Sequence, residues 1–203
     1  MKLFSRKAAG NGGCESVAAV SHRLTLDLSR ADTLATMLAN SRASRVVEIA
    51  DLLAGMYIYG WDRLSRYWEY DNQDRVEELL RKMCRISPER WNYWIQLYDR
   101  QRRDGDKRVR SLPFLQRLQK DSKTEMPFQR STELTALFKQ AEELAPFRDT
   151  TDGRNIPILT TECVLLCIVR NQKSEISRKL ASSGLNVPQL ERDALSSRRA
   201  RRD

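Results

Sequence analysis

One stretch, residues 158–195, constrains the fold of this 203-residue chain more than any other, because three helix patterns follow one another in it. The first pattern opens at Thr160-Thr161-Glu162, the second stops at Gly184, and the third starts near Pro188. The apolar residues recur at helical spacing: Val164, Leu165, Leu166, Ile168 and Val169, then Ile176 and Leu180, then Leu190, Ala194 and Leu195. The stretch therefore predicts three short helices in a fixed order.

The order of these helices resembles the Clp amino-terminal repeat, the small helical module at the front of Clp-type protein unfoldases. The family pattern is an aliphatic residue, Thr-Glu-His, a Leu-rich run, a break, an Ala/Leu helix, a Leu-Gly-aliphatic corner and a closing helix. The match runs without a gap from Ile158 to Leu190, and residues 131–145 (STELTALFKQAEELA) fit the first helix of the module. The resemblance implies a module that binds partners and catalyses nothing.

The same resemblance implies a binding site for phosphorylated arginine, which some members of the family have. A Thr at the start of the first helix and the Glu of Thr-Glu-His contribute to that site, and Ser131 and Glu162 align with them. A hydroxyl with helix-start amides suits a phosphate, and a carboxylate suits a guanidinium. The alternative is that both residues only cap their helices. The chain departs from the family where Cys163 replaces the His and Arg130 replaces an aromatic residue.

The N-terminal part of the chain resembles tetratricopeptide helical hairpins more weakly. An amphipathic pattern over Asp74–Arg85 is followed by Ser87-Pro88-Glu89, an aromatic-rich helix ending at Asp104-Gly105-Asp106, and a further helix over Arg108–Lys120. Two alternatives stay open. One is an unrelated stack of helical hairpins, and the other is a degenerate first Clp repeat, since Glu89 precedes Glu162 by nearly one repeat length.

Together these patterns predict an all-α chain, because no stretch alternates with period two for long enough to indicate a sheet. We expect a stack of helical hairpins followed by a single Clp-type repeat. The expected boundaries are a disordered tail over 1–21, the hairpin domain over 24–122, the Clp-type repeat over 126–196 and a basic tail over 197–203.

All four tryptophans and all six tyrosines lie between Tyr57 and Tyr98. With the interleaved arginines they fit a base-stacking and phosphate-contacting surface. At helical spacing they also fit a helix–helix core covered by arginine stems, which is the commoner arrangement. The candidate interaction surface consists of Trp61, Trp68, Trp91 and Trp94.

Composition narrows the classes of function. The net charge of +9, from 36 Lys+Arg against 27 Asp+Glu, favours acidic partners, although part of the excess lies in the two tails. The chain has no Gly-rich loop ending in Gly-Lys-Ser/Thr, and its one histidine, His22, is expected to be a solvated residue in or near the tail. We therefore expect no enzyme activity, no ATP or other cofactor, and no metal. Cys163 and Cys167 share one apolar helix face and are predicted to be buried.

No apolar run approaches the length that spans a bilayer, so we expect a cytoplasmic protein. The predicted function is that of a non-enzymatic adaptor in a bacterial protein-quality-control or signalling assembly. Its expected partner is a protein, either a Clp-type unfoldase or that unfoldase's substrates, with a homo-oligomer as a further possibility. The main alternative is a nucleic-acid-binding protein, and a third is a peripheral membrane or secretion-apparatus component.

Overall fold

A computed structural model describes residues 22–69, 72–103, 128–150, 155–171 and 174–196. These residues are mostly helical, with five short strands in two small sheets. The helices are α1 (Leu26–Ser41), α2 (Ile49–Leu64), α3 (Gln73–Met83), α4 (Pro88–Arg103), α6 (Thr132–Leu144), α7 (Thr161–Arg170), α8 (Glu175–Ser182) and α9 (Val187–Leu195), with a 3-10 turn η1 (Ser65–Tyr67) after α2. The strands are β1 (Arg23–Leu24), β2 (Val46–Val47), β3 (Gln129–Arg130), β4 (Phe147–Asp149) and β5 (Ile156–Leu159).

The strands correct the expectation of a wholly helical chain. β5 pairs in parallel with β1 and antiparallel with β4, and β2 pairs in parallel with β3. Each strand has only two to four residues, and four of the five lead directly into a helix. A strand this short cannot produce a visible period-two pattern, so no alternation of apolar and polar residues predicted the sheets.

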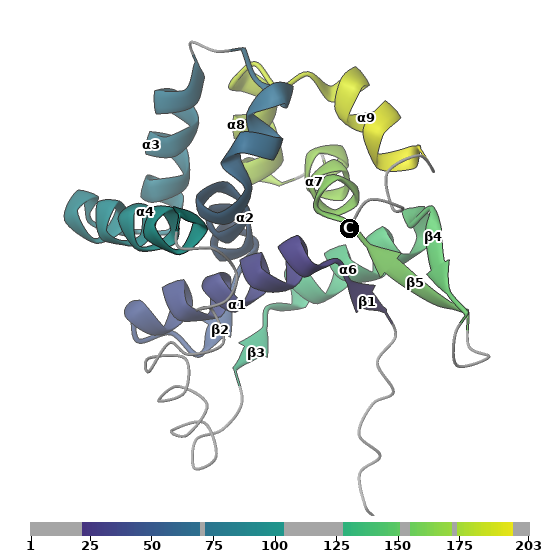
Figure 1. The fold of residues 1–203 in the computed structure, drawn as a ribbon, viewed down its shortest axis with the longest axis horizontal. Helices are drawn as coiled ribbons and strands as arrows, with labels where there is room; N and C mark the ends of the chain where they lie inside the picture. The colour runs from purple at the N-terminus through teal and green to yellow at the C-terminus, as the bar shows by residue number, and fades with distance from the viewer. Residues whose placement is uncertain (1–21, 70–71, 104–127, 151–154, 172–173, 197–203) are drawn as a thin grey trace, which may run out of the picture.

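The order of elements occurs twice along the chain. Residues 23–103 run strand, helix, strand and then three helices, and residues 129–195 run through the same order with β4 added before β5. The first strand of each half pairs with the strand before the second helix of the other half, β1 with β5 and β3 with β2. The two halves are therefore joined by two crossed parallel pairings (Figure 1).

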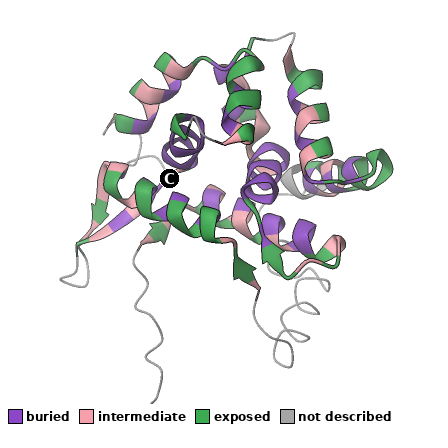
Figure 2. Ribbon diagram, turned by 180° about the vertical axis from the view of Figure 1, so that it is seen from behind, coloured by how far each residue is buried: buried purple, intermediate pink, exposed green. Residues whose placement is uncertain are grey.

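The two second helices, α2 and α7, form the centre of the molecule. Both are buried along most of their length, and nine of the ten residues of α7 are buried (Figure 2). Gly55 lets α2 approach α1 closely, because a Cβ at this position would lie 2.3 Å from the carbonyl oxygen of Ala31. Buried residues from both halves belong to a single hydrophobic cluster, so the segments expected as two domains share one core.

Several helix boundaries agree with the sequence patterns. Pro88 begins α4, and Gly184 follows the end of α8 with a φ of +81°, in the left-handed region that the Leu-Gly-aliphatic corner implies. Two non-glycine residues also have positive φ, Ala43 (56°) after α1 and Arg85 (54°) after α3. The helix predicted over Arg108–Lys120 and both expected tails lie outside the described residues.

Candidate partner-binding site

Glu162 lies in the first turn of α7 and is only 4 % exposed. Two arginines from the end of α2 and from η1 bind the same carboxylate oxygen. Arg63 Nε donates to Glu162 Oε1 over 3.1 Å, and Arg66 Nη2 donates to it over 3.0 Å. Burial of a carboxylate costs free energy unless the charge is paired and hydrogen-bonded, and these two guanidinium groups supply that pairing.

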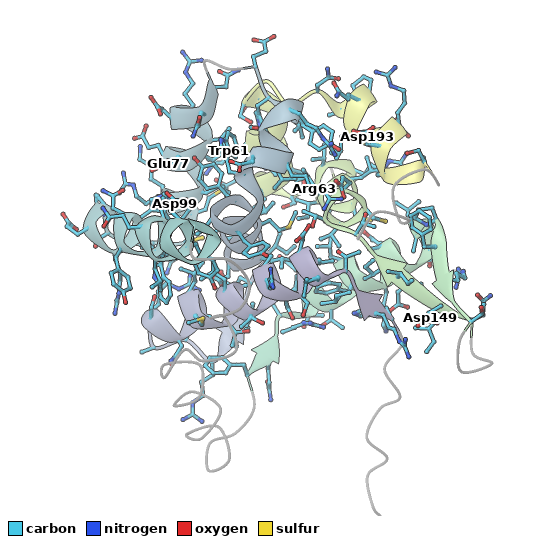
Figure 3. All side chains as sticks on the ribbon, in the orientation of Figure 1. Trp61, Arg63, Glu77, Asp99, Asp149 and Asp193 are labelled. Carbon is cyan, nitrogen blue, oxygen red and sulfur yellow. The ribbon has the colours of Figure 1, made fainter. Side chains whose placement is uncertain are left out.

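The ion pairs extend from Glu162 to α1 and α9. Arg63 also donates to Asp27 at the start of α1 over 2.5 Å, and Arg66 lies 3.5 Å from Asp193 of α9. Figure 3 labels Arg63 and Asp193 of this network. The hydroxyl of the fully buried Tyr67 accepts from Arg66 and donates to Asp193 over 2.9 Å. Burial and the nearby Glu162 carboxylate raise the pKa of Tyr67 well above its usual value, so this hydroxyl stays protonated and acts as a donor.

A cavity of about 240 Å³ adjoins this network. Asp27, Arg63 and Thr161 line its polar side, and Met56 and Leu64 line its apolar side. Gly60 opens onto it at a kink in α2, where φ is −121° and ψ is 19°. A Cβ added at Gly60 would meet nothing within 4 Å, so the kink leaves free volume beside the ion pairs.

Ser131, the other residue of the expected phosphoarginine site, caps α6 by accepting a hydrogen bond from the backbone N–H of Leu134 over 3.1 Å. Its own backbone N–H donates to the carbonyl oxygen of Val47, which places it beside β2 and the start of α2. Glu162 instead lies beside Arg63 and the start of α1. No hydrogen bond or ion pair joins Ser131 and Glu162. Ser131 bonds to the end of β2, whereas Glu162 lies in the first turn of α7.

The four tryptophans do not form one exposed surface. Trp91, Trp94 and Trp68 are buried, with exposed fractions of 0 %, 5 % and 9 %, and Trp61 is partly buried. Tyr57 packs against both Trp61 and Trp91, with ring centroids 4.4 and 5.8 Å apart. Trp68 Nε1 donates to Ser183 Oγ over 2.8 Å and so ties the segment after α2 to the turn between α8 and α9. These rings serve mainly as core.

The indole N–H groups of Trp91 and Trp94 are buried and have no hydrogen-bond partner in the described part of the chain. Both tryptophans lie on α4, on the face that packs toward α2. The exposed aromatic residue of this helix is Tyr93, which is 60 % exposed and lies edge-on to Trp94 at 5.6 Å.

The cysteines of α7 are buried as predicted, with Cys163 0 % and Cys167 3 % exposed. Cys163 Sγ donates to the carbonyl oxygen of Ala141 on α6 over 3.5 Å. The hydrogen bond with Cys167, together with burial, raises the pKa of Cys163, so this thiol is held in its unreactive protonated form.

His22 is not the solvated residue that the sequence suggested. Its Nδ1 lies 2.6 Å from Glu142 Oε1, and its ring stacks on Phe138 with centroids 5.2 Å apart. The reason is the pairing of β1 with β5, which carries the residue before β1 onto α6.

Sequence patterns identified Glu162 but not its partners. Arg63 and Arg66 precede Glu162 by 99 and 96 residues and lie in a segment that also fitted an arginine-covered core. Asp27 in α1 and Asp193 in α9 lie at polar positions of their helix patterns, where a solvated carboxylate is expected. Tertiary contacts between helices of both halves bring these five side chains together, and no local spacing in the sequence signals that.

Comparison of the chain with family models, with curated proteins and with solved structures gives no match. Within the described ranges, no three or more His, Cys, Asp or Glu side chains are grouped so that they could hold a metal ion. None of the helices in the described part of the chain is both long and apolar enough to cross a bilayer.

Proposed function

We propose that this protein is a non-enzymatic interaction protein, an adaptor, built from two copies of a Clp-type repeat. The observation that carries this proposal is the doubled order of elements with its crossed strand pairs. Under this proposal the N-terminal helices are a diverged first repeat, not tetratricopeptide hairpins. A pair of repeats closes its own apolar faces, which a single repeat could not do.

Equivalent positions in the two halves support the duplication. Thr25 and Ser131 precede the first helix of each half, and Glu48 and Thr160 precede the second. Arg85 and Gly184, both with positive φ, follow the third helix of each half. In this register the counterpart of Glu162 is Ala50, and Glu89 lies in a later helix.

If the chain contains two repeats aligned in this way, a phosphoarginine site is expected in the second half at most. The first half has no carboxylate equivalent to Glu162, and Glu162 itself is held by Arg63 and Arg66. A phosphoarginine from a partner would have to displace one of these guanidinium groups. We propose that Glu162 fastens the two halves together here and that partners are bound on the exposed surface.

In-cell photo-crosslinking of the full-length chain tests the proposal. The crosslinker p-benzoyl-phenylalanine replaces Leu26 or Tyr93, which are both 60 % exposed, and replaces Arg178 of α8 in a control. Crosslinks from Leu26 or Tyr93 to an unfoldase or protease subunit, or to substrates of either, support the adaptor proposal. Crosslinks to RNA or DNA alone overturn it in favour of the nucleic-acid alternative.

A further inference from the structure

One corner of the molecule gathers the C-terminal ends of two helices and the start of a third. Arg42, just past α1, donates from Nη1 to the carbonyl oxygen of Cys84 at the end of α3, over 2.9 Å. Arg90, in the first turn of α4, donates from Nη1 to the carbonyl oxygen of Ser41 over 2.8 Å. These two bonds bring the end of α1, the end of α3 and the start of α4 together on the left of Figure 1.

Three arginines at this corner have no carboxylate partner among the residues that the structure describes. Arg45 and Arg85 are exposed, and among the described residues neither has a hydrogen bond or an ion pair from its side chain. Arg90 is exposed, and within the described ranges its guanidinium group donates to the carbonyl oxygen of Ser41. Other cationic side chains near the corner have carboxylate partners, because Arg42 binds Asp51 and Lys82 binds Glu78.

The exposed carboxylates at the edge of the corner are already used by helix N-termini. The Glu48 side chain accepts from the backbone N–H of Asp51 in the capping box of α2. Glu89 lies in the first turn of α4, where hydrogen bonds from its own backbone N–H and from Ser87 lower its pKa. An anion at a helix N-terminus is stabilised by the helix dipole, so neither carboxylate is drawn away to Arg45 or Arg85.

Exposed apolar groups accompany these charges. Val46, next to Arg45, is 40 % exposed, and Tyr93, one turn after Arg90 on α4, is 60 % exposed. They are two of the four large hydrophobic residues that are exposed in the described part of the chain. Arginine and tyrosine are the residue types that carry most energy in protein interfaces, and they bind carboxylates and apolar side chains respectively.

Arg85 is also held in an unfavourable backbone conformation. Its φ of 54° is in the left-handed region, where glycine is preferred and where the equivalent residue of the other half is Gly184. The fold keeps a large cationic side chain at a position that would be more stable with glycine. Strain of this kind is found at functional surfaces more than elsewhere.

We propose that Arg45, Val46, Arg85, Arg90 and Tyr93, hereafter the arginine corner, bind an acidic protein segment that also carries an apolar side chain. The proposal rests on the adaptor function and names the chemistry of its partner. A protein segment fits better than single-stranded nucleic acid, because stacking of successive bases needs several exposed rings, and the corner offers one.

The test is fluorescence anisotropy of the full-length protein with a labelled 12-residue peptide of Glu, Asp and Leu. A Gln/Asn/Leu peptide of equal length and a 12-nucleotide single-stranded DNA are compared with it. We expect the acidic peptide to bind at least about tenfold more tightly than the neutral one. Arg45→Gln with Arg85→Gly should weaken binding at least about fivefold while leaving the melting temperature unchanged or raised.

The matched control removes an equal number of positive charges from the other half of the molecule. It is the double variant Arg178→Gln with Arg192→Gln, at exposed positions of α8 and α9. It should change peptide binding less than about twofold. Equal losses in both double variants, no preference for the acidic peptide, or tighter DNA binding that depends on Arg45 and Arg85 would each overturn the proposal. If protein crosslinks persist in the cell after such a result, the adaptor function stands and only this surface is refuted.

Discussion

Removal of the Glu162 carboxylate should lower the stability of the fold, because two arginines share this anion. Glu162→Gln leaves the Arg63 and Arg66 guanidinium groups without their shared anion in a mostly buried site. We expect the free energy of unfolding to fall by about 2–3 kcal/mol, because a broken buried pair leaves an uncompensated charge that the partial exposure of both arginines only partly relieves. Chemical denaturation measures it.

Glu191 provides the control for that variant. It pairs with Arg170 on the surface, where both side chains are more than 40 % exposed. Glu191→Gln should cost less than about 1 kcal/mol. Equal losses in the two variants would mean that Glu162 does not fasten the halves together.

Gly184 and Arg85 both have positive φ after a helix, but substitutions at the two positions should change stability in opposite directions. A Cβ at Gly184 would lie 2.5 Å from Asn72 Nδ2, and its φ of +81° strains any other residue. Gly184→Val should therefore destabilise the protein by about 1–3 kcal/mol. Arg85→Gly should leave stability unchanged or raise it by up to about 1 kcal/mol. Thermal unfolding of both variants checks this pair, and a loss of stability in Arg85→Gly would show that φ at this position is not strained.

Asp51 should make stability depend on pH with an uncommon sign. It is fully buried, Arg42 binds its Oδ2 over 2.8 Å, and its Oδ1 has no hydrogen-bond partner among the residues described. Burial raises its pKa above the ordinary 3.8, so the folded protein holds this proton longer than the unfolded chain. The contribution to stability is present below about pH 4 and is lost as pH rises through the folded-state pKa.

The comparison that isolates this effect is with Asp51→Asn, which keeps an acceptor for the backbone N–H of Glu48. The unfolding free energy of the wild type minus that of the variant should shrink as pH rises from about 4 to 7. A difference that grows with pH would show that the Arg42 ion pair outweighs burial.

At the scale of elements, α7 is the helix most open to test, because both of its cysteines face the core. Cys163 and Cys167 should react with a thiol reagent slowly in buffer and rapidly in denaturant, since the reagent reaches these buried side chains only when the helix is unpacked. Cys84 is buried as well and should behave in the same way. Rapid labelling of Cys163 in buffer would contradict the central position of α7.

Sequence patterns predicted where helices begin and end better than they predicted which elements pack against one another. The start of α4 at Pro88, the stop after α8 at Gly184 and the burial of Cys163 all follow from local signals. The strands and the ion pairs of Glu162 do not, because they depend on contacts between segments about a hundred residues apart.

At the scale of the whole molecule, the shared core predicts that both halves unfold together. All four tryptophans lie in the first half, and Cys163 and Cys167 lie in the second. Tryptophan fluorescence and the labelling of Cys163 and Cys167 in a Cys84→Ser background should therefore report the same denaturant midpoint, as expected of one cooperative unit. Two separated midpoints would show that the halves are independent domains.

The crossed strand pairs have a consequence for assembly. β1 pairs with β5, and β3 pairs with β2, so each half of the chain supplies one strand to each pairing. The same contacts form when the partner strand comes from a second molecule. Two molecules could exchange halves and keep every pairing and every buried contact, which makes a domain-swapped dimer the form of self-association that needs no new interface.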